Sequence, residues 1–339
     1  YTSGTTGRSK GAMLTQNNLH SNAQTLKKLW QVTKSDILIH ALPIFHTHGL
    51  FVALNTAMLA GAKVNFIPKF DIDEIIERLH ASTLLMGVPT FYTRLLADYR
   101  LTEELTKNMR LFISGSAPLL SETHEEFTKR TGHHILERYG MTETNMITSN
   151  PYHGERRPGT VGTSLADVQM KITDPKTGKE MAEGEIGMIE VRGPNVFKGY
   201  WNMPDKTALE LRETGYFITG DLGKLSSDGY LSIVGREKDL IISGGYNVYP
   251  KEVEDILNEL NQIDETAVFG IQDNDLGERV VAALVLENDK NFNQRKIEVF
   301  ANEKLARYKQ PKEYFVLDSL PRNSMGKVQK NELRKRFSS

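Results

Sequence analysis

The chain has 339 residues, which is enough for two or more domains with sizeable hydrophobic cores. Its formal net charge of -1 provides no overall basic field for nucleic acid, so any phosphate binding has to be local. The absence of cysteine excludes disulfides, thiolate metal sites and a cysteine nucleophile, and no apolar run is long enough to span a membrane.

Segments of helical length and strand length alternate over the first half of the chain. Apolar residues from Leu14 to Trp30 recur at roughly helical spacing and predict a helix over residues 15–30. The runs after it predict further strands and helices over residues 36–42, 49–60, 62–67, 72–80, 84–88, 89–99, 110–114, 121–130 and 134–138. This alternation predicts an α/β fold in which helices cover both faces of a parallel sheet and ligands collect at the carboxyl ends of the strands.

The sequence pattern changes at about Pro158. Runs at 161–172, 186–192 and 230–234, separated by turn signals, predict an antiparallel β-rich region. After the charged joint at 235–239, helices are expected over 251–260 and 293–305, and strands over 265–271, 280–287 and 313–317. We therefore expect an α/β part at 1–157, a β-rich subdomain at 158–236, a hinge at 237–239 and a small mobile α+β domain at 240–339.

The first twelve residues form a segment that is rich in glycine and hydroxyl groups and contains two cations, Arg8 and Lys10. Backbone N–H groups, hydroxyls and cations can together surround phosphate oxygens, so the segment is suited to bind a polyphosphate. The spacing from Gly4 to Ser9 does not match a Walker A loop. On composition alone, an ordinary solvated linker is about as good an interpretation.

Other polar motifs follow predicted strands. Thr142 and Glu143 place a hydroxyl beside a carboxylate, a combination that can contact a phosphate and its magnesium ion. The His46 and His48 pair has no third metal ligand close in sequence, which argues against zinc. Asp221 could bind ribose hydroxyls. Taken one at a time, each of these motifs is better explained by an ordinary turn, strand end or solvated surface charge.

The strings 1–12, 114–118, 138–144 and 320–327, in this order along the chain, resemble the motifs of the adenylate-forming superfamily, which includes acyl-CoA synthetases, peptide synthetase adenylation domains and luciferases. The resemblance implies ATP, Mg²⁺ and coenzyme A as cofactors, and it implies that the chain begins within a large domain whose N-terminal portion is missing. It also implies a nucleotide-binding set: Thr2, Ser3, Gly4, Thr5, Thr6, Gly7, Lys10, Gly115, Ser116, Ala117, Glu137, Arg138, Tyr139, Gly140, Asp221 and Arg236.

The same resemblance assigns roles to individual residues. Thr142 would contact the α-phosphate, Glu143 would hold Mg²⁺, and Lys327 would stabilise the charge that develops during adenylation. His46 matches the gate of the acyl pocket. Lys238 matches the hinge about which the small domain turns after adenylation. In that second arrangement, the adjacent glycines Gly244 and Gly245 would let the pantetheine arm of CoA pass close to the backbone. Gln16 departs from the family, which often has histidine there.

Within the superfamily, the stretch from Met141 through Lys327 looks most like malonyl-CoA synthetases. Binding an acid with a second carboxylate requires a buried cation in the acyl pocket, and we assign that role to Arg94, with Met141 and Thr47 shaping the space around the α-carbon. The expected activity is ATP-dependent ligation of malonate, and possibly of methylmalonate, to CoA.

The alternatives are a medium-chain or aryl acid as substrate, loading of a carrier protein, or a degenerate nucleotide-binding scaffold. We expect a small carboxylic acid as partner, no nucleic acid and no membrane span. We expect a cytoplasmic location, with an organellar one left open, and the oligomeric state is not predicted.

Overall fold

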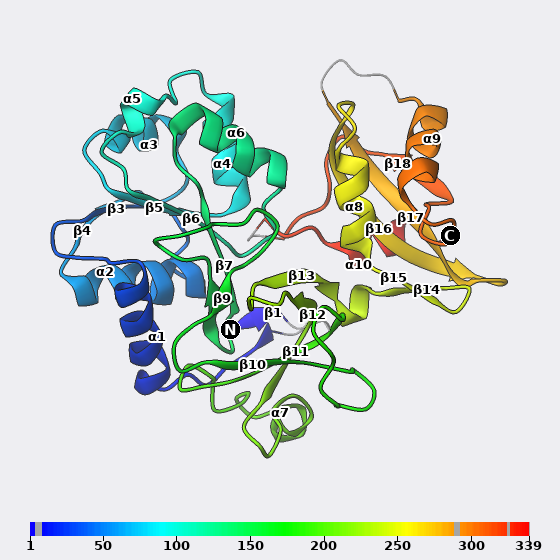
Figure 1. The fold of residues 1–339 in the computed structure, drawn as a ribbon, viewed down its shortest axis with the longest axis horizontal. Coiled ribbons are helices and arrows are strands. Elements are labelled where there is room, and N and C mark those ends of the chain that lie inside the picture. Colours follow the sequence, from blue (N-terminus) through cyan, green and yellow to red (C-terminus); the bar gives the residue numbers. More distant parts are fainter. Residues whose placement is uncertain (4–8, 288–291, 324–325, 339) are drawn as a thin grey trace. The chain divides into compact units, whose positions relative to one another are not determined.

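The computed structural model describes residues 1–3, 9–287, 292–323 and 326–338 (Figure 1). The chain divides into two compact units, which we call the first unit (residues 1–219 and 224–232) and the second unit (residues 220–223 and 233–339). Within the described ranges, no helix has both the length and the apolar character that crossing a membrane requires.

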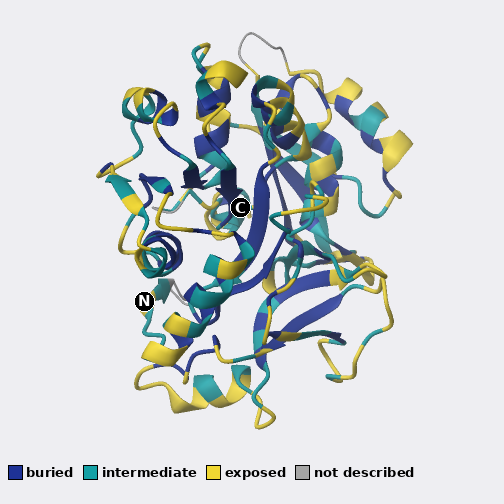
Figure 2. Cartoon of the chain, turned by 60° about the vertical axis from the view of Figure 1, so that its left-hand side comes forward, coloured by how far each residue is buried: buried dark blue, intermediate teal, exposed yellow. Residues whose placement is uncertain are grey.

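A seven-stranded sheet with the order β4-β3-β5-β6-β7-β8-β9 forms the centre of the first unit. Its strands are β3 (Ile37–His40), β4 (Lys63–Phe66), β5 (Leu84–Gly87), β6 (Leu111–Ser114), β7 (Leu136–Met141), β8 (Asn145–Ser149) and β9 (Thr163–Ser164). The strands from β4 to β7 pair in parallel, and β8 and β9 continue the sheet antiparallel. Every residue of β5 and β6 is buried, as expected for strands covered on both faces (Figure 2).

Helices cover both faces of this sheet, as the alternating pattern predicted. Their bounds are α1 (Gln16–Leu29), α2 (Asn55–Ala60), α3 (Ile72–Leu79), α4 (Pro89–Ala97), α5 (Glu103–Thr106) and α6 (Ser121–Thr131). Helices α1 and α2 lie on one side of the sheet and α3 to α6 on the other (Figure 1). Thr15 starts α1 with a capping box, because its hydroxyl accepts from the Asn18 N–H and its own N–H donates to the Asn18 side chain. Gly132 ends α6 in the left-handed region, at φ 73°.

Three predicted elements differ in detail. The helix expected over 49–60 consists of a π-helix, η1 (His48–Leu54), followed by α2. The strand expected to end at residue 138 continues to Met141, because β8 pairs with its extension, so that only residues 142–144 form the turn. The run at 161–172, expected as part of the antiparallel β region, contains β9 and the start of a separate strand, β10 (Gln169–Thr173). Hydrophobic patterning alone carried no signal for these breaks.

The β-rich region forms a four-stranded sheet in the order β10-β11-β12-β13, with β11 (Gly187–Arg192), β12 (Phe217–Leu225), β13 (Leu231–Arg236) and the short helix α7 (Pro204–Glu210). At the start of the chain, β1 (Thr2–Ser3) pairs antiparallel with β2 (Ser9–Lys10). The backbone after β2 continues beside residues 198–201: Trp201 N–H donates to Gly11 at 2.7 Å, and Lys198 N–H donates to Met13 at 2.9 Å. These bonds place the segment before α7 directly against the end of the first hairpin.

The second unit has one sheet in the order β15-β14-β17-β16, with β18 parallel to β17. Its elements are the 3₁₀ helix η2 (Glu237–Asp239), β14 (Ile241–Ser243), β15 (Tyr246–Val248), α8 (Pro250–Asn258), β16 (Ile263–Asp273), β17 (Gly277–Leu286), α9 (Gln294–Lys304), β18 (Glu313–Val316) and α10 (Lys330–Phe337). Alternate residues of β16 enter two different cores: Val268 packs with residues of α8 and α9, whereas Phe269 packs with Leu333 of α10. The sheet is therefore covered on both faces.

Candidate active site

The β1–β2 hairpin brings Thr2 opposite Lys10. Of the other residues predicted to bind phosphate, Ser3 pairs with Ser9 through its backbone, and Gly4, Thr5, Thr6 and Gly7 lie outside the described residues. Lys10 is half-buried, and its position at the end of the hairpin is fixed by the pairing of the backbone on both sides.

The ammonium group of Lys10 contacts Tyr200 and Glu210. Its Nζ donates to the Tyr200 hydroxyl at 3.2 Å, lies 4.3 Å from the centroid of the Tyr200 ring, and is 3.7 Å from Glu210 Oε2. The Tyr200 hydroxyl also lies 2.8 Å from Glu143 Oε1 and 2.6 Å from Glu210 Oε2. Lys10 of the predicted phosphate loop is thus connected through one phenol to Glu143, the predicted magnesium ligand.

Glu143 is almost fully buried, at 2 % exposure. Its Oε1 accepts from Tyr200, while its Oε2 is buried and has no hydrogen-bond partner among the described residues. Its backbone carbonyl accepts from the Phe197 N–H at 2.8 Å, which fixes the turn on which it sits. A buried carboxylate oxygen without a donor is costly unless a cation reaches it, so Glu143 fits a divalent cation such as Mg²⁺.

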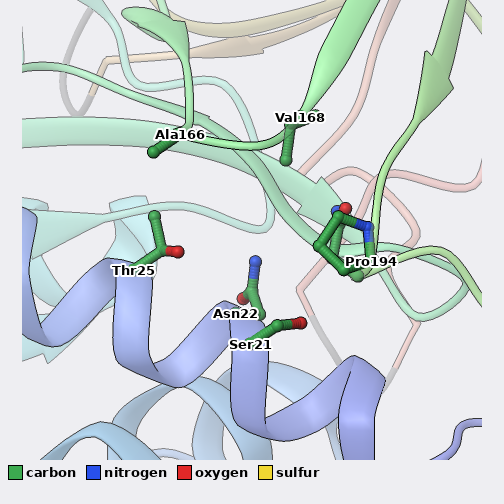
Figure 3. Close-up of a pocket in the computed structure, with 7 residues that line it drawn as sticks. Ser21, Asn22, Thr25, Ala166, Val168 and Pro194 are labelled. Carbon is green, nitrogen blue, oxygen red and sulfur yellow. The ribbon is translucent and has the colours of Figure 1, made fainter.

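Asparagines on both sides hold the turn at 142–144 in place. Asn195 Nδ2 donates to the carbonyl of Thr144 at 2.8 Å, and Asn22 on α1 donates to the Met146 carbonyl at 2.8 Å and accepts from the Met146 N–H at 3.2 Å. Figure 3 shows the face of α1 that carries Asn22, opposite Pro194. The crevice between them is only about 10 Å³, room for about one water, and none of the predicted site residues lines it. The hydrogen bonds from Asn22 and Asn195 therefore hold the turn at 142–144 in place, and the crevice itself is not part of the predicted site.

A larger cavity of about 250 Å³ brings together three predicted residues, His46, Thr47 and Thr142. The hydroxyls of Thr47 and Thr142 are 3.5 Å apart. His46 Nδ1 accepts from the backbone N–H of His48 at 3.2 Å, which orients the imidazole ring. The rest of the lining is mainly apolar: Tyr1, Ala12, Leu14, Leu19, Phe45, Leu50 and Phe51. A cavity with an apolar wall and a few hydroxyl and imidazole groups is typical of a small-molecule site.

Arg138, on β7, is a buried charged residue of the first unit. It is 3 % exposed, and its Nε and Nη2 atoms are buried without a hydrogen-bond partner among the described residues. Burial lowers the pKa of its guanidinium to about 9. Gly115 lies directly against this guanidinium, so that a Cβ at residue 115 would overlap it. A buried cation with unused donors is suited to an anionic ligand.

His48 and Ser116 belong to the same neighbourhood. Ser116, at a positive φ of 74°, places its Oγ 3.2 Å from His48 Nδ1. Burial holds the pKa of His48 well below its usual range, and the positive charge of Arg138 lowers it further. His48 is therefore neutral at physiological pH, and Arg138 supplies the positive charge here.

The role of Arg94 as the partner of the second carboxylate stays a prediction. Arg94 is exposed on α4, with its guanidinium 5.1 Å from the ring centroid of Phe70. Arg138, predicted as part of the nucleotide-binding set, is buried, and it is not among the residues that line the larger cavity. Met141 ends β7 and is half-buried, as is Ala117 after β6.

The remaining nucleotide-binding predictions in the first unit fall on β7. Tyr139 is buried, and Glu137 is buried with its Oε1 3.8 Å from His124 Nδ1. A Cβ at Gly140 would overlap the carbonyl oxygen of Asn145, which explains a glycine where β7 and β8 come close together.

In the second unit, two residues predicted to hold the ribose contact each other. Arg236 Nε lies 2.7 Å from Asp221 Oδ1, across the neighbouring strands β13 and β12. The predicted hinge residue Lys238 is exposed in η2, next to Asp239, which pairs with Arg334 at 3.1 Å. Gly244 and Gly245 have φ of 58° and 81° and make the tight turn between β14 and β15.

Lys327, the predicted adenylation catalyst, is exposed on a turn of the second unit. The turn is held by the side chain of Asn323, whose Oδ1 accepts from the Lys327 N–H at 3.0 Å, and by the Asn323 N–H, which donates to the Lys327 carbonyl at 3.0 Å. These two bonds fix the backbone of the turn that carries Lys327.

Sequence reasoning missed the roles of Tyr200, Glu210 and His48. Tyr200 lies 57 residues from Glu143 along the chain, so no local spacing relates them. His48 was noticed only as half of a His-x-His pattern. These contacts depend on the tertiary fold and could not be read from a motif.

Comparison with known proteins places these residues in a family. The sequence pattern of the AMP-binding enzyme family matches residues 1–201, and that of the AMP-binding enzyme C-terminal domain matches residues 252–327. The chain belongs to the AMP-binding enzyme family. This confirms the predicted adenylate-forming fold, with a large α/β domain and a small C-terminal domain.

Among AMP-binding enzymes, the chain is 39 % identical to a malonate–CoA ligase of Arabidopsis thaliana, covering 99 % of this chain and 60 % of the relative. It is 37 % identical to a long-chain-fatty-acid–CoA ligase of Bacillus subtilis, covering 98 % and 60 %. The ATP-bound crystal structure of MatB from Rhodopseudomonas palustris is 56 % identical, with a TM-score of 0.98, and the match covers 100 % of this chain and 67 % of MatB. The chain spans about three fifths of the length of these curated relatives.

Proposed function

We propose that the protein to which this chain belongs is an ATP-dependent malonate–CoA ligase. A carboxylate oxygen of malonate attacks the α-phosphorus of ATP, the bond to pyrophosphate breaks, and malonyl-adenylate forms. The thiol sulfur of CoA then attacks the acyl carbon, loses its proton, and displaces AMP to give malonyl-CoA. The family, and the relatives that carry the malonate–CoA ligase name, support this proposal.

The observation that carries the choice of acid is the buried guanidinium of Arg138. Two of its nitrogen atoms lack partners among the described residues, and leaving such donors unpaired inside a protein is costly. During adenylation one carboxylate of malonate becomes part of the mixed anhydride, whereas the second keeps its charge. That second carboxylate can accept two hydrogen bonds from Arg138. A fatty or aryl monocarboxylic acid would leave the cation uncompensated.

We assign the remaining roles as follows. Glu143 would hold Mg²⁺, which supplies charge neutralisation of the phosphates when bound, and Thr142 would contact the α-phosphate. His46 and Thr47 would form the wall of the acyl cavity, with Met141 beside it. Arg94, which is exposed, remains a second candidate for the distal carboxylate. In this proposal the chain contributes a largely apolar cavity wall to the acid site, together with the buried guanidinium of Arg138, which is not among the residues lining that cavity.

The second unit contributes to both half-reactions in this proposal. Lys327 would stabilise the charge on the carboxylate and the α-phosphate, and Asp221 and Arg236 would bind the ribose. After adenylation, turning about Lys238 would present the Gly244–Gly245 turn to the pantetheine arm of CoA. The proposed domains follow the expected division at residues 157, 236 and 239, and the proposed location is cytoplasmic.

The test is pyrophosphate release by the full protein with ATP and Mg²⁺, comparing malonate, methylmalonate, acetate, octanoate and benzoate, with and without CoA. We expect release that depends on malonate, a free thioester that depends on CoA, and loss of both in Lys327→Ala. Turnover with octanoate or benzoate in place of malonate would favour a different acid. Pyrophosphate release without free thioester would favour loading of a carrier protein, and ATP binding without release would favour a scaffold.

A further inference from the structure

The hydroxyl of Tyr200 has one hydrogen and two carboxylate neighbours. Glu143 Oε1 lies 2.8 Å away and Glu210 Oε2 lies 2.6 Å away, both within hydrogen-bond distance. Burial raises the pKa of Tyr200, and the adjacent Glu143 and Glu210 raise it further, so the phenol stays protonated. At any moment the hydroxyl can donate to only one of the two carboxylates.

The positive charges around Tyr200 are distributed unequally between these carboxylates. Glu210 has two cations, Lys206 Nζ at 2.5 Å and Lys10 Nζ at 3.7 Å. Burial alone would raise the pKa of Glu210, but Lys206, Tyr200 and Lys10 together lower it. Within the described part of the chain, Glu143 has no ion pair, and Tyr200 is the donor to its side chain. Glu143 is therefore the stronger competitor for the phenol hydrogen while Lys10 stays beside Glu210.

The heavy atoms of Tyr200 are held firmly, so that the hydrogen is the part that can move easily. The side chain is 2 % exposed, and its ring packs edge-on against Phe197 at 4.9 Å between centroids. Its backbone N–H donates to Thr207 Oγ1 at 2.9 Å, and it pairs with Ala12 as an isolated antiparallel bridge. Rotation about the C–O bond of the phenol is enough to transfer the hydrogen bond from one carboxylate to the other.

We propose that Tyr200 is a positioning residue that couples phosphate binding by Lys10 to cation binding by Glu143. This inference rests on the proposed use of ATP and Mg²⁺. When the Lys10 ammonium turns toward a phosphate, Glu210 loses one of its two cations and becomes a better acceptor than before, although Lys206 stays beside it. A cation that binds Glu143 then meets less resistance in turning the phenol hydrogen to Glu210, and Glu143 Oε1 joins Oε2 as an oxygen available to the cation. No covalent bond changes, because the proton stays on the phenol.

Two variants separate this coupling from a packing role. Tyr200→Phe keeps the ring and removes the hydroxyl, so Glu143 Oε1 has no donor whether or not nucleotide is bound. Glu210→Gln keeps the phenol and removes the competing charge, so the hydrogen stays on Glu143. Tyr216→Phe is the matched control, because Tyr216 also has a lysine over its ring, Lys171 Nζ at 4.5 Å, and lies outside the proposed site.

The first readout is Mn²⁺ binding to the full protein without nucleotide, followed by electron paramagnetic resonance of the free ion. We expect Mn²⁺ affinity to rise in Tyr200→Phe and to fall in Glu210→Gln. The second readout is the ratio of the ATP dissociation constants measured without and with Mg²⁺. We expect this ratio to fall about fivefold or more in both variants and to stay at the parent value in Tyr216→Phe.

Changes of Mn²⁺ affinity in the same direction in the two variants, or an ATP ratio within about twofold of the parent in both, would overturn the coupling. If Tyr200→Phe fails to fold by circular dichroism, the Glu210→Gln result decides, since that variant keeps the buried ring. If the parent protein releases pyrophosphate but both variants keep its ratio of ATP dissociation constants, only the proposed role of Tyr200 is contradicted. A parent that binds no ATP would overturn this inference together with the proposed function.

Discussion

Gly115 leaves the space that the guanidinium of Arg138 occupies. A methyl group at residue 115 would overlap the guanidinium, so that Arg138 would have to move within a buried site. We expect Gly115→Ala to raise the KM for malonate about tenfold or more, because a displaced guanidinium loses its bidentate geometry. The free energy of unfolding should fall by about 1–3 kcal/mol. Steady-state kinetics and urea denaturation measure the two effects, and an unchanged malonate KM would show that Arg138 does not contact the acid.

Arg138→Met should separate stability from function. The parent buries a cation with two unpaired nitrogen atoms, so replacing it with an apolar side chain of similar length should raise the free energy of unfolding by about 1–3 kcal/mol without ligand. Malonate should raise the melting temperature of the parent and have no effect on the variant. A large loss of stability in Arg138→Met would instead identify Arg138 as a structural residue. Arg94→Ala tests the second candidate: it should respond to malonate nearly as the parent does, and loss of that response would assign the distal carboxylate to Arg94 instead.

His40 should make the stability of the protein depend on pH. It is fully buried at the end of β3, and burial lowers its pKa from the usual 6.5 to about 4. Between these values the unfolded chain binds the proton and the folded chain does not, so the contribution to stability is present above about pH 6.5 and is lost as the pH falls toward 4. His40→Phe should reduce the loss of stability between pH 7 and pH 4.5 by about 2 kcal/mol, allowing for solvent screening. Urea denaturation of both proteins at the two pH values measures this loss. An equal loss of unfolding free energy in the parent and in His40→Phe would show that His40 does not cause the pH dependence.

A substitution of Asn22 on α1 tests whether its hydrogen bonds hold the turn at 142–144 in place. Asn22→Leu removes both hydrogen bonds to Met146 and leaves a buried N–H and a buried carbonyl with fewer partners, at a cost of about 2 kcal/mol. We expect the Mg²⁺ concentration for half-maximal activity to rise as the turn that carries Glu143 loosens. Thr25→Ala on the same face of α1, beside the same crevice, should stay within about 0.5 kcal/mol of the parent. If the two variants behave alike, Asn22 does not position the turn.

The predictions from sequence were most successful where the signal was local. Alternating apolar runs gave the parallel sheet and its helices, and Thr15, Pro89 and Gly132 mark helix ends by their own chemistry. Strand β7 was predicted too short, because its extension depends on pairing with β8. It could be stated from the sequence that an acid with a second carboxylate needs a buried cation in its pocket. Which cation is buried depends on the fold and could not be predicted. The helix carrying Arg94 turns this residue outward, whereas β7 carries Arg138 into the interior.

The partners of Glu143 illustrate the same limit. A carboxylate after a strand could be noticed in the sequence, but Tyr200 reaches it only because residues 198–201 run beside residues 11–13. Glu210 joins the group because α7 directs its side chain toward the phenol, and Lys206 on the same helix pairs with Glu210. Contacts between such distant segments follow from the packed structure alone.

The most direct test of the account compares kcat/KM for malonate and for propionate, which lacks the second carboxylate, in the full protein and in Arg138→Met. Pyrophosphate release gives the rates. We predict that the parent prefers malonate about 100-fold or more and that the variant loses this preference, because only a second carboxylate can pair with the buried guanidinium. An equal preference for malonate in Arg138→Met, or a parent that prefers propionate, would contradict the assignment of Arg138 and the choice of malonate that rests on it.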